Sequence, residues 1–146
     1  MNRARIRCVE LHARGPILKV RLGLQAEDAK DLPNPPPFRE CSALLDTGAR
    51  GSCVKTRTAE LFGIDPSDER LMRGINTREE WHDVYDFRLA ILNESAQPIW
   101  EGDIQLIGVD QMANPRYNII IGRDILGLGT LVYYGKLEQI RLQFRR

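Results

Sequence analysis

Short runs of alternating apolar and polar residues recur along the chain, and this pattern most strongly limits what it can fold into. The alternation is clear in residues 17–24 (ILKVRLGL), 84–92 (VYDFRLAIL) and 138–144 (EQIRLQF). A period of two predicts half-buried β-strands, because successive side chains of a strand point to opposite faces. Residues 99–109 add further strand. With roughly eight to ten short strands, we predict an all-β fold with one or two short helices, a small barrel or sandwich.

Two segments depart from the strand pattern. Residues 56–63 (TRTAELFG) predict a short helix, with Thr56 or Thr58 as its N-cap and Gly63 as its left-handed end. Residues 25–40 (QAEDAKDLPNPPPFRE) are polar and contain four prolines, so we expect a long, partly extended surface loop. Too few residues precede this loop to form a domain, and we therefore expect all 146 residues to form one.

Charge and hydropathy argue against several classes of partner. The formal net charge of +1 predicts no nucleic-acid partner, and we interpret the arginines near both ends as solvated terminal charges. No apolar run approaches the roughly 20 residues that a membrane span needs, and the first residues lack the apolar segment of a secretory signal. The three cysteines have no CxxC spacing, as expected of free thiols in a reducing compartment. These features predict a cytoplasmic protein that binds neither membrane nor nucleic acid.

The usual signatures of cofactor, metal and nucleophile sites do not occur in the sequence. It contains no Walker A loop, no GxGxxG, no HExxH and no GxSxG. His12 and His82 have no partner at metal-ligand spacing, and we interpret both as ordinary surface or strand residues. Cys53 is interpreted as a small core residue rather than a reactive thiol. We therefore expect no metal and no cofactor.

One acidic residue has an unusual place in this pattern. Asp46 directly follows the apolar residues 41–45 (CSALL) and precedes Thr47 and Gly48. A carboxylate at the end of a buried strand is costly unless it is hydrogen-bonded or takes part in chemistry. The Thr47 hydroxyl is able to lock a turn, and Gly48 lets backbone approach closely. The segment therefore predicts a carboxylate that is held still at a functional site.

Two segments together carry a family resemblance. Residues 43–49 (ALLDTGA) and 118–126 (NIIIGRDIL) lie about 75 residues apart in an otherwise β-type sequence. In this order and separation they resemble the two motifs of the retroviral-type aspartic proteases, the retropepsins. The resemblance extends from about Ile17 to the C-terminus and implies a closed β-barrel of the acid-protease half type. It also implies that the IIIG segment crosses behind the Asp-Thr-Gly loop, with structural support from Gly122, Arg123 and Asp124.

The resemblance implies an aspartic endopeptidase that is active as a symmetric homodimer. The chemistry needs two carboxylates, one acting as base on a bound water while the other donates to the substrate carbonyl. Two close carboxylates share a proton, because they do not both ionise easily. The chain contains a single Asp-Thr-Gly, so Asp46 of each of two copies has to face the other across a two-fold axis. The catalytic positions are then Asp46, Thr47 and Gly48.

The family also has a flap, a hairpin that folds over a bound polypeptide. The resemblance places it at residues 72–84 (MRGINTREEWHDV), with its tip near residues 75–78, and an ordinary exposed hairpin is the alternative. Peptide is expected to bind extended beneath it through main-chain hydrogen bonds. The residues expected to contact substrate are Ala49, Arg50, Gly74, Ile75, Asn76, Thr77 and Arg78.

The sequence departs from the family pattern at several positions. Many retroviral members have an acid where this chain has Arg50, so Arg123 needs another partner, for which Asp124 and an acid of the second chain are the candidates. The candidate flap is heavily charged and keeps one glycine. Family dimers often interleave their terminal strands, for which residues 3–11 and 138–144 are available. Two alternatives remain: a protease-like dimer that binds peptides or partner proteins without cutting them, and an unrelated β-domain with a chance Asp-Thr-Gly turn.

Overall fold

The computed structural model describes residues 2–73 and 78–145, and it is mainly β, as the alternating runs predict. The strands are β1 (Arg3–Arg7), β2 (Ile17–Gly23), β3 (Arg39–Leu45), β4 (Cys53–Lys55), β5 (Asp68–Arg73), β6 (Glu79–Leu92), β7 (Pro98–Val109), β8 (Ile119–Ile121), β9 (Gly129–Tyr134) and β10 (Gln139–Phe144). The helices are α1 (Leu11–Arg14), α2 (Ala26–Lys30), α3 (Thr56–Glu60) and α4 (Arg123–Leu126), with a 3₁₀ helix η1 (Gly135–Leu137).

Six of these strands form a closed barrel. In the order β2-β3-β8-β4-β7-β6 each strand is hydrogen-bonded to the next, and β2 also pairs with β6. This last pairing is antiparallel and places Val20 opposite Ile91 and Gly23 opposite Arg88. Closure satisfies the backbone groups that a free sheet edge would leave exposed. The closed barrel that the resemblance implied is confirmed.

Alternate residues of the barrel strands fill its interior. On β6, the side chains of Tyr85, Phe87, Leu89 and Ile91 are buried in the main core. Phe87 also packs edge-on against Phe62, with ring centroids 5.1 Å apart. The period of two in residues 84–92 therefore identified the core face of this strand, because side chains two residues apart share one face.

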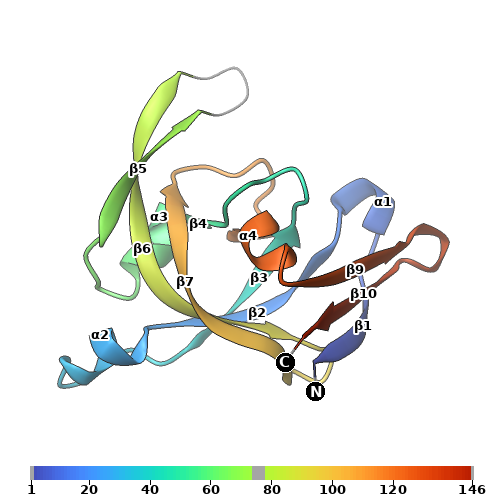
Figure 1. Cartoon of the computed structure of the whole chain (residues 1–146), viewed down its shortest axis with the longest axis horizontal. Coiled ribbons are helices and arrows are strands. Elements are labelled where there is room, and N and C mark those ends of the chain that lie inside the picture. The colour runs from blue at the N-terminus through green and yellow to red at the C-terminus, as the bar shows by residue number, and fades with distance from the viewer. Residues whose placement is uncertain (1, 74–77, 146) are drawn as a thin grey trace.

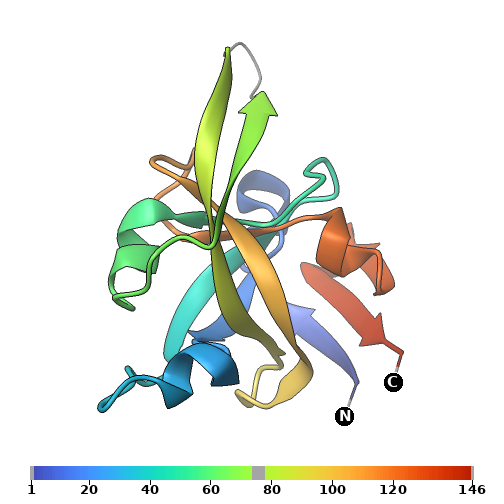
Figure 2. The ribbon, with the colours of Figure 1, turned by 60° about the vertical axis from the view of Figure 1, so that its left-hand side comes forward.

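Two parts of the chain lie outside the barrel (Figures 1 and 2). Strand β5 pairs only with β6, and the two form a hairpin that projects from the barrel, with Arg73 opposite Glu79. Three further strands form a second sheet in the order β1-β10-β9. One face of this sheet is buried through Ile6, Ile140 and Leu142. The molecule thus has a projecting hairpin at one end and the chain termini near the other.

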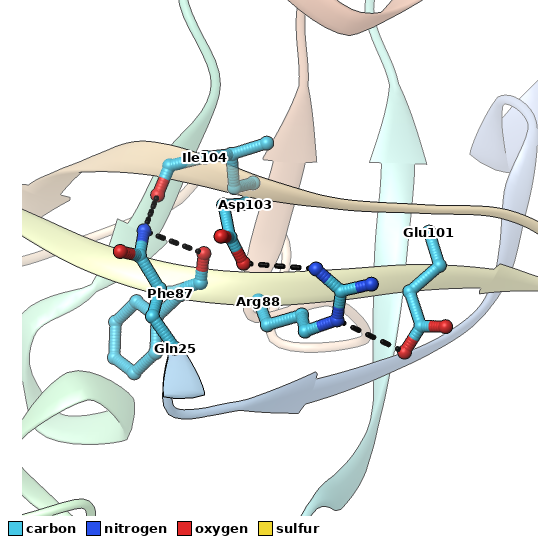
Figure 3. A network of polar contacts seen from close by, with 6 residues as sticks. All are labelled: Gln25, Phe87, Arg88, Glu101, Asp103 and Ile104. Carbon is cyan, nitrogen blue, oxygen red and sulfur yellow. Dashed lines mark hydrogen bonds and ion pairs between the residues drawn. The ribbon is translucent and has the colours of Figure 1, made fainter. Parts of the chain in front are cut away.

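Polar contacts join β6 to β7 and anchor the start of the segment 25–40 (Figure 3). Gln25 donates from its amide nitrogen to the carbonyl of Phe87 at 3.2 Å. Arg88 lies between Glu101, at 3.4 Å, and Asp103, at 3.0 Å, both on the neighbouring strand. The hydrogen bond to Asp103 is the main cause of the raised pKa of Arg88. These charges are substantially exposed, so each pair contributes about 0–1 kcal/mol to stability.

The structure contains more helix than the sequence predicts. Within residues 25–40, described above as an extended loop, α2 forms one helical turn in which Glu27 and Lys30 are an ion pair at 2.6 Å. Helix α1 also was not expected, and it begins after Glu10 with φ 52° and ends at Gly15 with φ 78°. Both helices are too short to show a 3.6-residue period in the sequence. No helix among the described residues is long and apolar enough to cross a membrane.

Helix α3 lies in the expected segment, but the predicted N-cap is wrong. Its N-cap is Lys55, and no side chain caps it. The hydroxyl of Thr56 donates to Asp110 at 3.2 Å. The hydroxyl of Thr58 accepts from the side-chain amide of Asn118 at 3.3 Å. Both threonines are therefore engaged by residues more than 50 positions away. Gly63 has φ 67°, the left-handed conformation expected of it.

The terminal strands pair with each other within one chain. Strand β1 runs antiparallel to β10, from Arg3 opposite Gln143 to Arg7 opposite Gln139. Strand β9 pairs with the other edge of β10. Both edges of β10 are thus filled, which leaves no edge of residues 138–144 for interleaving with a second copy. The arginines near the N-terminus lie on a paired strand rather than in a loose terminus.

Candidate active site

Asp46 lies at the point where β3 leaves the barrel. Its backbone N–H donates to the carbonyl of Ile121 at 2.9 Å, which extends the pairing of β3 with β8 by one residue. Its carboxylate oxygen Oδ1 accepts from the backbone N–H of Gly48 at 2.8 Å, and its carbonyl accepts from Ala49 at 3.2 Å. The side chain is half-buried in a single chain. The turn therefore fixes the carboxylate through its own backbone.

Residues 46–52, the site loop, connect β3 to β4, and strand β8 lies between these two strands in the sheet. It runs parallel to β3, with Leu45 opposite Ile121, and antiparallel to β4, with Cys53 opposite Ile120. The chain leaving β3 therefore has to pass the end of β8 before it enters β4. Residues 46–52 make this crossing, so their position depends on a strand that lies more than 60 residues later in the sequence.

At Gly122, the backbone that follows β8 lies close to the backbone of residues 46–52. Gly122 is buried, and its N–H donates to the hydroxyl of Ser52 at 2.9 Å. A Cβ at this position would lie 2.8 Å from the carbonyl oxygens of both Ala49 and Gly51. Real Cβ atoms essentially never approach backbone oxygens so closely. The crossing therefore requires glycine here for close approach of two backbones.

Arg123 and Asp124 hold the loop from the start of α4. Their backbone N–H groups donate to the carbonyls of Ala49, at 2.8 Å, and Arg50, at 3.2 Å. The guanidinium of Arg123 donates from Nη1 to the carbonyl of Thr47 at 2.6 Å. Asp124 was one of the two partners expected for Arg123. The Arg123 guanidinium does not bind it and donates to the main-chain carbonyl of Thr47 instead.

Ser52 is a supporting residue that the sequence reasoning missed. Its hydroxyl donates to Asp124 at 2.7 Å and accepts from the N–H of Gly122, and its N–H donates to the second oxygen of Asp124 at 3.0 Å. The residue is 0% exposed. A serine that opens an apolar strand in the segment GSCV was the available signal, because a buried hydroxyl requires partners.

Replacing Ser52 with alanine is expected to lower the free energy of unfolding by about 1–3 kcal/mol, because the buried N–H of Gly122 loses its acceptor. Urea unfolding measures this loss. Ser67→Ala is the matched control, since Ser67 is exposed and water replaces its bonds, so we expect a change within about 0.5 kcal/mol. Equal stability of the two variants would show that Ser52 does not brace the loop.

The outer surface of the site loop is open in a single chain. Thr47, Gly48 and Arg50 are exposed and Ala49 is half-buried. Arg78, which directly precedes β6 in the projecting hairpin, is also exposed. The other residues expected at the hairpin tip, Gly74, Ile75, Asn76 and Thr77, lie outside the described residues. The structure thus brings together the Asp-Thr-Gly turn and its support, whereas the substrate-contacting set stays a prediction.

A small apolar cluster connects the projecting hairpin to the site strands. Its buried members are Cys53 of β4, Val84 of β6 and Ile107 of β7. Met72 of β5 and Ile120 of β8 pack against them. Ile120 directly precedes Ile121, whose carbonyl accepts the Asp46 N–H. This cluster is separate from the main barrel core. The base of the hairpin and the strand behind Asp46 therefore share one apolar surface.

The thiols have the properties of core residues rather than nucleophiles. Cys8, Cys41 and Cys53 are free and buried. Burial raises the pKa of Cys53 to about 11, with smaller contributions from the carboxylates of Asp124 and Asp46. Burial likewise raises the pKa of Cys8 to about 11 and raises that of Cys41. Because the thiolate is the reactive species, a raised pKa lowers reactivity at neutral pH.

We expect the three thiols to react slowly with a disulfide reagent in the folded protein. At pH 8 a thiol with a pKa of about 11 is roughly one part in a thousand thiolate. Ellman's reagent should therefore react slowly with the native protein and release the full thiol content in denaturant. A rapid native phase that disappears in Cys53→Ser would contradict the interpretation of this residue as core.

The histidines show no arrangement of metal-ligand type. Nδ1 of His82 lies 2.9 Å from the carbonyl of Gly108, on the neighbouring strand, and His12 lies in α1. Across residues 2–73 and 78–145, no group of three or more His, Cys, Asp or Glu side chains is placed to hold a metal ion.

Comparisons with known proteins support the fold and not more. No family model matches the chain, and no curated protein does at a significant level. A retropepsin-like aspartic protease from Rickettsia conorii has a similar structure, with a TM-score of 0.59 and 11% identity over 97% of this chain and 90% of that one. The Simian Foamy Virus (mac) protease (TM-score 0.45, 14% identity, 75% and 91% of the chains) and the EIAV protease in complex with the inhibitor HBY-793 (0.43, 19%, 77% and 85%) also match. The chain has the retropepsin-like fold.

Proposed function

We propose that this chain is an aspartic endopeptidase in which Asp46 of two identical copies forms the active site. One observation carries the proposal. The Asp46 carboxylate lies at the end of a barrel strand, held by the Gly48 N–H, in a loop that β8 and α4 fix through at least five hydrogen bonds. Such rigid support for a half-buried acid is typical of a catalytic group. The retropepsin-like fold is consistent with it.

The proposed chemistry follows from pairing two such carboxylates. Two acids close together hold one proton between them. The ionised one takes a proton from water, which attacks the peptide carbonyl, while the other donates its proton to the carbonyl oxygen. The first acid then passes the proton it took to the amide nitrogen, and the C–N bond breaks as the carbonyl re-forms and returns a proton to the second acid. The products are a free amine and a free carboxylic acid. Within one chain only Asp46 occupies an Asp-Thr-Gly turn, so the site is incomplete without the second copy.

Strand β9 supports the proposal of a homodimer. It is one of the two edges of the second sheet, and, unlike the arginine-rich β1, its sequence, GTLVYY, has no charge and no proline. Edge strands usually carry such protective residues, because bare edges pair with other chains. Tyr133 of β9 is 52% exposed, and Leu128 and Leu137 beside the strand are 54% and 60% exposed. Antiparallel pairing of β9 with its copy is two-fold symmetric, and α4 links this edge directly to the Asp46 loop.

The substrate proposed is an extended polypeptide between the projecting hairpin and the Asp46 loop. Strand β5 pairs only with β6, so the hairpin offers a free edge for main-chain hydrogen bonds, and the Asp46 loop presents the exposed Arg50. Met72 and Ile120, half-buried members of the apolar cluster, suit contact with apolar substrate side chains. Three free thiols fit a reducing compartment, and we therefore place the enzyme in the cytoplasm.

Incubation with a denatured protein mixture between pH 4 and pH 7, followed by mass spectrometry of the new peptide ends, tests the activity. We expect cleavage at internal bonds. Chains that bind and stay uncut would favour the alternative of a peptide-binding protein. No binding and no cleavage at any pH would contradict both.

Tyr133→Lys is expected to weaken the dimer at least tenfold, because it adds one positive charge from each copy to the uncharged β9 edge. Sedimentation over a range of concentrations measures this, and cleavage should be lost at low concentration and return at high concentration. Leu32→Lys, in the distant segment 25–40, is the control and should dimerise normally. A wild-type protein that sediments as a monomer while it cleaves would contradict the homodimer.

A further inference from the structure

One face of the second sheet gathers arginines from both ends of the sequence. Arg3, Arg5 and Arg7 occupy alternate positions of β1, so their side chains share the face opposite to buried Ile6. In the antiparallel register Arg5 lies directly opposite Arg141 of β10. Like charges in directly opposed positions destabilise a sheet. The fold therefore accepts an electrostatic cost at this place.

The arginine face borders a cavity of about 540 Å³. Its lining comes from strands β1 and β10 and from the turn that joins β6 to β7. These elements lie at the opposite end of the molecule from the projecting hairpin (Figures 1 and 2). The cavity is thus remote from the proposed catalytic site. Its lining residues are Arg3, Ala4, Arg5, Asn93, Glu94, Ser95 and Arg141.

The positive charge in this cavity is not neutralised by the protein. Among the described residues, Arg3, Arg5 and Arg141 take part in no ion pair. Glu94 is the single acid of the lining, and its carboxylate accepts the backbone N–H of Arg7 at 2.6 Å. Three guanidinium groups thus face one carboxylate that already has a partner. The remaining charge attracts an anion.

Arg141, which lines this cavity, has a side-chain hydrogen-bond donor without a partner. Its Nε is buried and has no partner, and it is the one buried side-chain nitrogen or oxygen with this property in residues 2–73 and 78–145. Leaving a buried donor of a charged group unpaired costs roughly 1–3 kcal/mol or more. Arg5 is already positioned, because its guanidinium lies 5.3 Å from the ring centre of Tyr134 on β9. One guanidinium is thus held in place and a second offers a free donor.

We propose that this cavity binds an oxyanion of the phosphate type, either free phosphate or the phosphate group of a small molecule. A planar guanidinium presents several N–H donors in a fixed fork, which matches the oxygens of a phosphate. A dianion between Arg5 and Arg141 offsets their repulsion and accepts hydrogen bonds from the guanidinium groups that line the cavity. Because β1 pairs only with β10, the same anion ties the N-terminal strand to its neighbour. Binding does not involve Asp46.

Isothermal titration with inorganic phosphate, at an ionic strength held constant with sodium chloride, tests this site on the full chain. We expect saturable binding of one phosphate per chain and a rise of several degrees in the melting temperature at saturation. Glycerol phosphate is the second probe: tighter binding than inorganic phosphate identifies a phosphate monoester as the ligand, and equal binding identifies the free ion. Asp46→Asn should bind phosphate as the wild type does, so this test is independent of the proposed protease activity.

Arg141→Gln is expected to weaken phosphate binding at least tenfold, and Arg3→Gln, on an exposed position, gives a second variant if the first does not fold. Arg57→Gln removes an exposed arginine of α3 away from the cavity and should leave binding unchanged. An equal loss of phosphate binding in all three variants would show that only the overall charge matters, and would contradict the proposed site. So would a melting temperature that phosphate raises no more than chloride does.

Discussion

Asp46→Asn is expected to abolish peptide cleavage while the fold and the dimer persist. Asparagine has nearly the same shape, and its side-chain oxygen still accepts the Gly48 N–H that now binds the Asp46 carboxylate at 2.8 Å. It provides neither a base for water nor a proton for the carbonyl. General acid–base catalysis contributes about 10²–10⁴-fold per group, so a symmetric loss should exceed about 10³-fold in kcat/KM. Cleavage of a fluorogenic peptide measures it.

Mixing the wild type with this variant makes the prediction specific to a shared site. If each active site needs one Asp46 from each copy, a heterodimer of one wild-type chain and one Asp46→Asn chain is inactive. Excess variant should then suppress wild-type activity as subunits exchange. Asp65→Asn is the control, since it removes an exposed carboxylate outside the site loop and should change neither quantity. An unchanged cleavage rate in Asp46→Asn would end the assignment.

Gly122→Ala is expected to cost both stability and activity. The added methyl would lie 2.8 Å from the carbonyl oxygens of Ala49 and Gly51, and both are backbone atoms of the site loop. Overpacking of this kind costs about 1–3 kcal/mol, and the melting temperature should fall by several degrees. The loop that carries Asp46 has to move, and a displacement of about 1 Å at a catalytic group costs on the order of 10²-fold in rate.

Gly135→Ala is the matched control for this substitution. Gly135 lies in η1, and its added methyl would meet only the ring of Tyr133, at 3.3 Å, which is able to shift. Thermal melts, and kcat/KM measured at a protein concentration that keeps both variants dimeric, should therefore differ clearly. If Gly122→Ala melts and cleaves like the control, the close approach at Gly122 does not position the site.

Local patterns predicted the strands well and the short helices poorly. The alternation in residues 84–92 identified the core side chains of β6, because a half-buried strand repeats every two residues. Helices α1 and α2 were missed, since four or five residues do not complete a recognisable helical period. The N-cap of α3 was assigned to threonines whose hydroxyls bind Asp110 and Asn118 instead. Those partners are distant in sequence, and no local rule includes them.

The motif residues were found, but their interactions were not. Asp46, Gly122 and Arg123 were named from ALLDTGA and NIIIGRDIL alone. That Arg123 donates to the Thr47 carbonyl, and that Ser52 joins Asp124 to Gly122, depends on where α4 meets the site loop. The same holds for the terminal strands, residues 3–11 and 138–144, which were expected to interleave with a second copy and whose β1 and β10 pair with each other within one chain.

The sequence by itself determined the class of fold and the position of Asp46, the acid at the end of a buried strand. These follow from side-chain periodicity and from the cost of burying a carboxylate, which are properties of neighbouring residues. The tertiary structure alone decided that β8 passes between β3 and β4, that Gly122 has to be glycine, and that Arg5 lies opposite Arg141. Each of these joins residues more than 60 positions apart. Their contacts arise from barrel closure and strand register, which the packing of the whole chain sets together.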